Sequence, residues 1–149
     1  MKTNRILTSV VILALAATTF VTLKSDTTPA EDTGIAFKTL SFDEAKALAK
    51  EENKLIFIDA YTTWCGPCKY MAKNVFTQKA VGDYYNEHFI NLKVDMEKGE
   101  GPILARKYAV RGYPTFLFLK PDGTIAKKTM GVTSPDNFIG WAKAAVDKQ

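Results

Sequence analysis

The chain has 149 residues, enough for one domain with a buried core, and its hydrophobic content of 46% and charged content of 24% are ordinary for a globular protein. The formal charge of +4 is misleading because Lys2, Arg5 and Lys24 carry three of the positive charges, and residues 26–149 hold 17 basic and 16 acidic side chains. A domain so nearly neutral offers no basic surface, so we expect no nucleic-acid partner. Two cysteines and one histidine are too few for a four-ligand thiolate site, so we expect no metal.

Residues 1–24 have the pattern of an export leader. Lys2 and Arg5 form a short positive region, and residues 6–23 are apolar apart from small and hydroxyl residues. The apolar run is barely long enough to cross a bilayer, so an uncleaved membrane anchor is the alternative to a cleaved signal peptide. Its five hydroxyl residues favour cleavage, and the absence of a cysteine after it excludes a lipoprotein anchor. Both interpretations predict an exported domain, preceded by a flexible polar spacer over residues 25–34.

The next segments predict a strand, a helix and a second strand. Residues 35–40 have the composition of a first edge strand. Ser41 and Glu44 have the spacing of a capping box, which predicts a helix that ends near Glu52. Residues 55–60 are almost continuously apolar, as expected for a central strand that helices cover on both faces.

The two cysteines of the chain, Cys65 and Cys68, stand where this strand gives way to a helix that we predict to run from Cys68 to Phe76. Pro67 suits the first turn, where its missing N–H costs nothing. Free backbone N–H groups and the helix dipole stabilise a thiolate at such a position. We therefore expect an exposed, nucleophilic sulfur on Cys65 and a screened resolving thiol on Cys68. The alternative is a structural disulfide, although so short a loop would gain little stability from it.

Six further elements are predicted from periodicity and turn residues. They are a helix capped by Thr77 that ends at Tyr85 or His88, a strand over 89–94, a helix over 102–108, a strand over 115–119, its antiparallel partner over 124–129, and a helix that starts at Ser134 and ends near Val146. A charged loop over 95–101 is expected to be solvated, and the single histidine is given no role. The order predicts an α/β fold, a mixed central β-sheet flanked by helices on both faces.

Three motifs resemble the thioredoxin family, in the order in which that family has them. Residues 64–69, Trp-Cys-Gly-Pro-Cys-Lys, resemble its active-site signature, and residues 110–115, Val-Arg-Gly-Tyr-Pro-Thr, resemble its cis-proline loop. Asp59, six residues before Cys65, matches its buried acid. The resemblance implies a thioredoxin fold over residues 35–149, most similar to exported members such as the C-terminal domain of the reductase DsbD.

The resemblance also implies a proton-transfer role for Asp59. A buried carboxyl has a raised pKa, which suits it to exchange a proton with Cys68 when the mixed disulfide is resolved. The alternative is a solvated acid at a strand end, or a helix cap. The lysine that partners this acid in the family would fall on Asn91, and whether Lys93, on the same strand face, takes its place is left open.

Further site residues follow from the same resemblance. Pro114 is implied to be cis and to face the cysteines, and the backbone of Tyr113 would hydrogen-bond an extended substrate; the alternative is an ordinary trans-proline. Trp64 is expected to be an exposed substrate contact, with core packing as its alternative. Gly66 and Pro67 are expected to tune the redox potential, because Gly-Pro is the pair of reducing thioredoxins, at about −270 mV against about −120 mV for the oxidant DsbA.

The sequence therefore predicts an exported, periplasmic thiol–disulfide oxidoreductase that reduces protein disulfides. It would need no cofactor beyond the redox-active disulfide Cys65–Cys68. We expect a monomer, tethered to the inner membrane through residues 6–23 if these are not cleaved. In an oxidising compartment its electrons would come from a membrane-embedded thiol reductant such as a DsbD-like transporter. The alternatives are a disulfide oxidase or isomerase, and a non-catalytic binding module switched by the disulfide.

Overall fold

The computed structural model describes residues 34–149. The predicted leader, its cleavage or anchoring, and the spacer up to residue 33 lie outside the described residues. The elements are, in chain order, α1 (Phe42–Glu51), β1 (Leu55–Tyr61), α2 (Gly66–Asn74), α3 (Lys79–His88), β2 (Phe89–Asp95), α4 (Gly101–Lys107), β3 (Thr115–Leu119), β4 (Ile125–Met130) and α5 (Pro135–Val146). None of these helices is both long enough and apolar enough to cross a bilayer.

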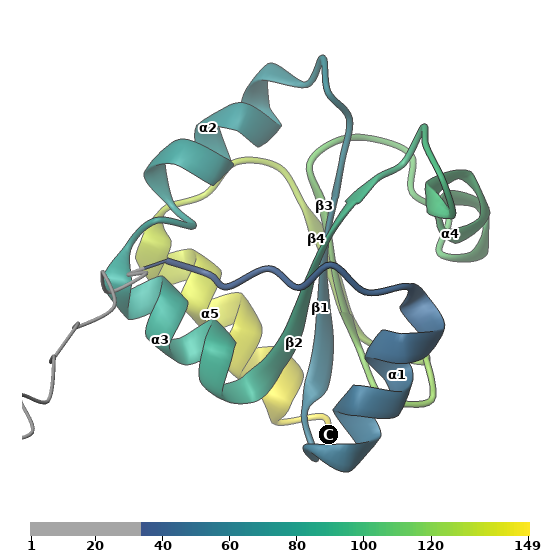
Figure 1. The fold of residues 1–149 in the computed structure, drawn as a ribbon. Helices are drawn as coiled ribbons and strands as arrows, with labels where there is room; N and C mark the ends of the chain where they lie inside the picture. Colours follow the sequence, from purple (N-terminus) through teal and green to yellow (C-terminus); the bar gives the residue numbers. More distant parts are fainter. Residues whose placement is uncertain (1–33) are drawn as a thin grey trace, which may run out of the picture.

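The described residues form one four-stranded mixed sheet in the order β2-β1-β3-β4, with helices on both faces (Figure 1). The strand β1 pairs in parallel with β2 and antiparallel with β3, and β4 completes a hairpin with β3. The helices α2, α3 and α5 cover one face, and α1 and α4 cover the other. This arrangement confirms the predicted α/β fold and the thioredoxin fold.

The central strand β1 explains how the two cores form. Residues 55–60 are all fully buried, as the continuous apolar run predicted. Successive side chains of a strand point to opposite faces. Leu55 and Phe57 therefore pack with α2, α3 and α5, whereas Ile56 and Ile58 pack with α1 and α4. The same alternation places Asp59 on the face that α2 covers.

Local capping signals account for two of the helix starts. Ser41 accepts a hydrogen bond from the backbone N–H of Glu44, and the Glu44 carboxylate accepts one from the backbone N–H of Ser41, so the predicted capping box is present. Ser134 caps α5 in a similar way, through the backbone N–H of Asn137. Both helices begin one residue after their cap, as the sequence indicated.

The prediction of an edge strand over residues 35–40 is wrong, because this segment is irregular. Its backbone donors go to three different parts of the molecule. Ile35 donates to the carbonyl of Phe76, and Lys38 donates to the carbonyl of Asn91 in β2. Ala36 donates instead to the side chain of Asn86. With partners in separate elements, the segment cannot form the repeated ladder that defines a strand.

The predicted cap of the third helix is also wrong. Gln78, not Thr77, occupies the N-cap position of α3, and it makes no side-chain capping bond. The hydroxyl of Thr77 donates instead to the carbonyl of Lys73, one turn back, because a threonine can satisfy a carbonyl of the preceding helix as readily as an N–H of the next. The other boundaries agree with the predictions within two residues; α2 begins at Gly66, before Cys68.

The aromatic core beneath α3 and α5 gives a first prediction. The ring centroid of Phe57 lies 4.8 Å from that of Tyr85, 5.3 Å from Phe118 and 5.8 Å from Phe138. Phe57→Ala should lower the free energy of unfolding in urea by about 3–5 kcal/mol, because it leaves a cavity among rings that cannot close over it. The exposed control Ile125→Ala should cost less than about 0.5 kcal/mol. Equal losses in the two variants would contradict this description of the core.

Candidate active site

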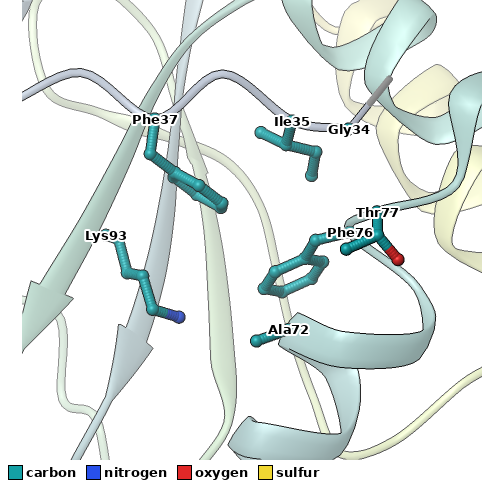
Figure 2. Close-up of a pocket in the computed structure, with 7 residues that line it drawn as sticks. All are labelled: Gly34, Ile35, Phe37, Ala72, Phe76, Thr77 and Lys93. Carbon is teal, nitrogen blue, oxygen red and sulfur yellow. The ribbon is translucent and has the colours of Figure 1, made fainter. Parts of the chain in front are cut away.

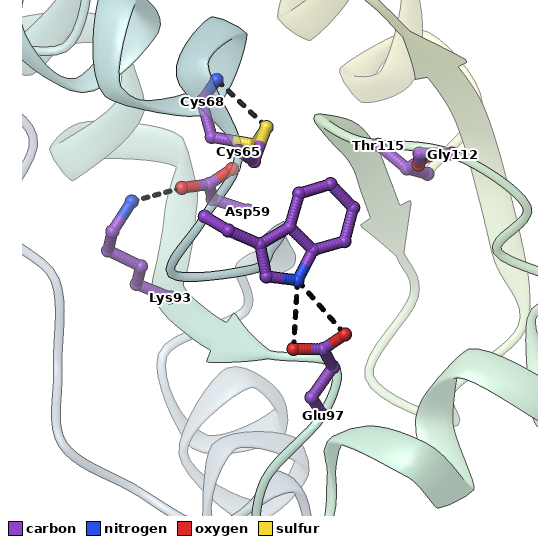
Figure 3. Close-up of a disulfide and its surroundings, with 8 residues drawn as sticks. Asp59, Cys65, Cys68, Lys93, Glu97, Gly112 and Thr115 are labelled. Carbon is purple, nitrogen blue, oxygen red and sulfur yellow. Dashed lines mark hydrogen bonds and ion pairs between the residues drawn. A yellow bond between two sulfur atoms is a disulfide. The ribbon is translucent and has the colours of Figure 1, made fainter.

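The two cysteines form a disulfide at the N-terminus of α2, where β1 ends (Figure 3). Cys65 is the N-cap residue, and its sulfur accepts a hydrogen bond of 3.1 Å from the backbone N–H of Cys68. The Cα atoms of the two cysteines are 5.3 Å apart, within the normal range for a disulfide. Pro67 lies in the first turn, as predicted. The helix end thus directs a backbone N–H at the Cys65 sulfur. The same N–H would stabilise a thiolate at this position.

The expected exposure of the Cys65 sulfur does not hold in this oxidised protein. Both cysteines are only 3% exposed. In a disulfide each sulfur covers part of the other, which accounts for some of this burial. The two residues nevertheless face different spaces. Cys65 lines a surface hollow of about 430 Å³, called here the Cys65 hollow; its lining is Trp64, Cys65, Gly66, Pro67, Arg111, Gly112 and Tyr113.

Cys68 faces a smaller space of about 90 Å³, called here the Cys68 hollow, which it lines together with Tyr61, Thr62, Thr63, Lys69, Ala72 and Lys93. The wider hollow therefore belongs to the predicted nucleophile, and the narrower one to the predicted resolving cysteine. This asymmetry gives an incoming disulfide more room at Cys65 than at Cys68.

Asp59 is a fully buried acid in β1. Burial raises the pKa of its carboxyl, and the positive charge of Lys93 opposes that rise. The two residues stand opposite each other in the parallel pairing of β1 with β2, and Lys93 Nζ donates to Asp59 Oδ2. The other oxygen, Oδ1, has no hydrogen-bond partner within residues 34–149. The alternatives of a solvated acid and of a helix cap are both wrong.

The open question about the partner lysine is thereby answered. Lys93 is the residue that pairs with Asp59. Asn91 is buried two residues earlier in β2, where its side-chain amide donates to the carbonyl of Tyr85 and to the side chain of Asn86. Asn91 and Lys93 lie on the same face of β2, but they stand at different points along the strand. Only Lys93 stands directly opposite Asp59 in the pairing of β1 with β2.

Lys93 also connects the buried acid to the surface. Its ammonium lies 4.4 Å from the ring centroid of Tyr61, 5.5 Å from that of Phe76 and 5.6 Å from that of Phe37. Figure 2 shows it extending toward the groove of about 290 Å³ that Phe37 and Phe76 line. Because Lys93 also lines the Cys68 hollow, the Asp59–Lys93 pair stands beside Cys68, the predicted resolving cysteine. A proton acceptor at this position can serve Cys68.

Trp64 is 65% exposed, so its packing into the core is excluded. Its indole N–H donates to both carboxylate oxygens of Glu97, at 3.1 and 3.0 Å (Figure 3). Its ring meets that of Tyr113 edge to face, with the centroids 5.9 Å apart. The sequence does not indicate a role for Glu97, because the charged loop that carries it is expected to be solvated. Trp64 is thus held over the rim of the Cys65 hollow.

The loop before β3 supplies the opposite side of this hollow. The peptide bond between Tyr113 and Pro114 is cis. Thr115, the first residue of β3, donates through its hydroxyl to the carbonyl of Gly112 at 2.7 Å, which fixes the turn. Tyr113 therefore lines the same hollow as Cys65, and within residues 34–149 its backbone N–H and C=O make no hydrogen bond. Gly66 and Pro67, the predicted tuning pair, line that hollow as well.

Comparison with known proteins decides the family. A family model described as a thioredoxin-like domain matches residues 42–145. The chain belongs to the thioredoxin-like family. With its Cys65–Cys68 pair, this thioredoxin-like protein is a thiol–disulfide oxidoreductase. Within residues 34–149, no three histidine, cysteine or acidic side chains are grouped so that they could hold a metal ion.

The individual proteins that match this chain differ in how similar they are to it. Thioredoxin-1 of Drosophila melanogaster is 39% identical over 84 residues, which cover 56% of this chain and 74% of the relative. A solution structure of a proposed disulphide isomerase from Bacteroides thetaiotaomicron is 47% identical, with a TM-score of 0.70, and the match covers 78% of this chain and 96% of that one. The oxidised C-terminal domain of DsbD from Neisseria meningitidis is 26% identical, with a TM-score of 0.59 and coverage of 74% and 97%.

The raised pKa of Asp59 predicts how the stability of this thioredoxin-like protein depends on pH. The folded state holds the proton of the Asp59 carboxyl more tightly than the unfolded state does. The stability that the protonated carboxyl contributes is therefore complete below the usual aspartate pKa of about 3.9, and it is lost as the pH rises through the raised pKa. Asp59→Asn should abolish that loss. The unfolding free energy of the oxidised variant should exceed that of the wild type at pH 7, and the difference should shrink toward pH 4.

Lys93→Met provides the matched comparison for this prediction. Removing the positive charge that opposes the shift should raise the pKa of Asp59 further, so the loss of stability should extend to higher pH than in the wild type. Urea unfolding curves measured between pH 4 and pH 9 test both variants. If Asp59→Asn is less stable than the wild type at pH 7, the conclusion that burial disfavours the charged form of the Asp59 carboxyl is wrong.

Proposed function

We propose that this protein reduces disulfide bonds of exported proteins through the Cys65–Cys68 dithiol. The observation that carries the proposal is the position of Cys65, at a helix N-terminus and in a hollow that it shares with Trp64 and Tyr113. That position supplies the three needs of thiol–disulfide exchange, namely a stabilised thiolate, a second thiol within reach and a surface for the substrate.

The reaction follows from these positions. In the reduced protein, the Cys65 thiolate attacks one sulfur of a substrate disulfide, and the other substrate sulfur leaves as a thiolate. Cys68 then gives up its proton, with Asp59 as the acceptor, and its sulfur attacks Cys65. The bond between Cys65 and the substrate breaks, and the substrate leaves with both sulfurs reduced. The two electrons come from the protein, which ends as the Cys65–Cys68 disulfide described above.

Substrate binding is assigned to the backbone of Tyr113, to Pro114 and to the exposed ring of Trp64. The N–H and C=O of Tyr113, which have no hydrogen-bond partner within residues 34–149, lie where an extended segment could add to the end of β3 as a further strand. Such a contact uses only backbone atoms of the substrate, so it suits an enzyme that acts on many proteins. The exposed Trp64 ring, fixed by Glu97, would cover the bound segment from the other side of the hollow.

The reductive direction, the location and the electron donor are part of the proposal. Gly66 and Pro67 are the intervening pair of reducing thioredoxins. The leader sequence and the similarity to the C-terminal domain of DsbD support an exported, periplasmic monomer, tethered through residues 6–23 if these are retained. A DsbD-like membrane transporter would recharge the dithiol, and no cofactor beyond the disulfide takes part.

One observation favours a second candidate, oxidation or isomerisation of disulfides. The Bacteroides thetaiotaomicron structure, 47% identical, is that of a proposed disulphide isomerase. The reduction potential separates the two candidates. A value near about −270 mV supports reduction, whereas a value near about −120 mV, that of a strong oxidant, supports the second candidate.

Turnover and trapping test the proposed function. The full chain, supplied with dithiothreitol, should catalyse the reduction of insulin, and Cys68→Ser should accumulate mixed disulfides between Cys65 and exported proteins because the resolving thiol is missing. The matched variant Cys65→Ser should do neither, since it lacks the attacking sulfur. If the wild type does not catalyse the reduction and Cys68→Ser traps nothing, the protein is a binding module and the proposal fails.

A further inference from the structure

We propose that Arg111 makes this enzyme selective for disulfides that have a carboxylate close to the reactive cysteine of the substrate. The inference rests on the proposed function, since it concerns the substrates of the same site. It comes from the positive charge of Arg111 in the Cys65 hollow and from the absence of an ion-pair partner for Arg111 among residues 34–149.

The Cys65 hollow contains one charged side chain. Arg111 lines it together with Cys65 and Tyr113, and the six other lining residues are neutral at pH 7 in the oxidised protein, where Cys65 is held in a disulfide. Arg111 is exposed and directly precedes the Gly112–Tyr113–Pro114 turn that would hold the substrate backbone. A substrate segment that reaches Cys65 from this turn therefore passes the guanidinium.

Nothing within residues 34–149 neutralises Arg111. It takes part in none of the ion pairs of this region, and it makes no hydrogen bond there. Glu97, a nearby acid of the site, has its carboxylate on the indole N–H of Trp64 and does not line the hollow. Lys69, next to the disulfide in the sequence, lines the Cys68 hollow and not the Cys65 hollow. Arg111 thus keeps its guanidinium donors available to a substrate group. In the reduced protein, which meets the substrate, the Cys65 thiolate adds a negative charge to the same hollow, and the guanidinium offsets its repulsion of a substrate carboxylate.

An arginine in this setting favours a carboxylate for geometric and electrostatic reasons. The planar guanidinium presents several N–H donors in a fixed fork, which matches the two oxygens of an aspartate or glutamate. A bound substrate displaces water from the hollow beside the Trp64 and Pro67 side chains, and this strengthens the contact. A lysine at the same substrate position would be repelled. Exposed ion pairs of this type correspond to about a two- to fivefold preference.

A matched set of substrates tests the proposal. Three synthetic disulfide peptides would differ only in the residues that flank the cysteine, which are aspartate, asparagine or lysine. With the full chain and dithiothreitol, kcat/KM should be about two- to fivefold higher for the aspartate peptide than for the asparagine peptide, and lowest for the lysine peptide. The preference should fall toward one in 1 M NaCl, where the charges are screened.

Substitutions locate the source of the preference. In Arg111→Gln the ratio of the aspartate to the asparagine peptide should fall to about one, and in Arg111→Glu the lysine peptide should become the best of the three. Arg106→Gln removes an exposed arginine of α4 that does not line the hollow, so it should keep the wild-type ratio.

The outcomes separate this proposal from the proposed function. Equal kcat/KM values for the three peptides, or an aspartate preference that Arg111→Gln retains, would overturn the role of Arg111 while leaving the reductase intact. If none of the peptides is reduced by the wild type, the proposed function itself fails.

Discussion

The hydrogen bond from the backbone N–H of Cys68 to the sulfur of Cys65 defines the geometry on which the site depends. It exists because a buried strand, β1, leads through residues 62–65 into a helix, so that unsatisfied N–H groups of the first turn meet the side chain of the N-cap residue. Serine or aspartate usually accept such a bond. A cysteine at that position has its sulfur held in place and, when reduced, its thiolate stabilised by the helix end.

The second constraint is a buried carboxyl, at a position where an uncharged side chain would make the fold more stable. Asp59 lies on the face of β1 that α2 covers, and its burial raises the pKa of the carboxyl. An apolar residue in its place would cost the fold nothing in desolvation. In the proposed reaction, its position beside the Cys68 hollow, which Lys93 lines, suits it to accept the Cys68 proton when the mixed disulfide is resolved. Lys93 keeps that carboxyl hydrogen-bonded and links it to the surface.

Features that depend on short-range pattern could be predicted from the sequence. The capping box at Ser41 and the buried run of β1 are encoded within a few residues, and both are as expected. Features that depend on distant contacts could not be. The strand predicted over residues 35–40 is absent because its donors find partners in three separate elements, and Thr77 turns back to α2 instead of capping α3.

The same division applies to the site. Cys65 and Cys68 were identified from their spacing, whereas Glu97 reaches Trp64 across 33 residues of sequence and could only be found in the fold. Strand alternation kept both Asn91 and Lys93 as candidates for the partner of Asp59. The register between β1 and β2 decides for Lys93, and register is set by the pairing of whole strands, which no single strand encodes.

The most direct test of this account measures the thiolate of Cys65 in the reduced protein. The rate of alkylation by iodoacetamide, followed at each cysteine by mass spectrometry across pH 4–10, reports the fraction of each thiol that is ionised. The account predicts that Cys65 reacts first and with a midpoint below about 8.5, the value of an ordinary thiol, while Cys68 reacts slowly and only at higher pH. A midpoint for Cys65 at or above that value, or equal reactivity of the two cysteines, would contradict it.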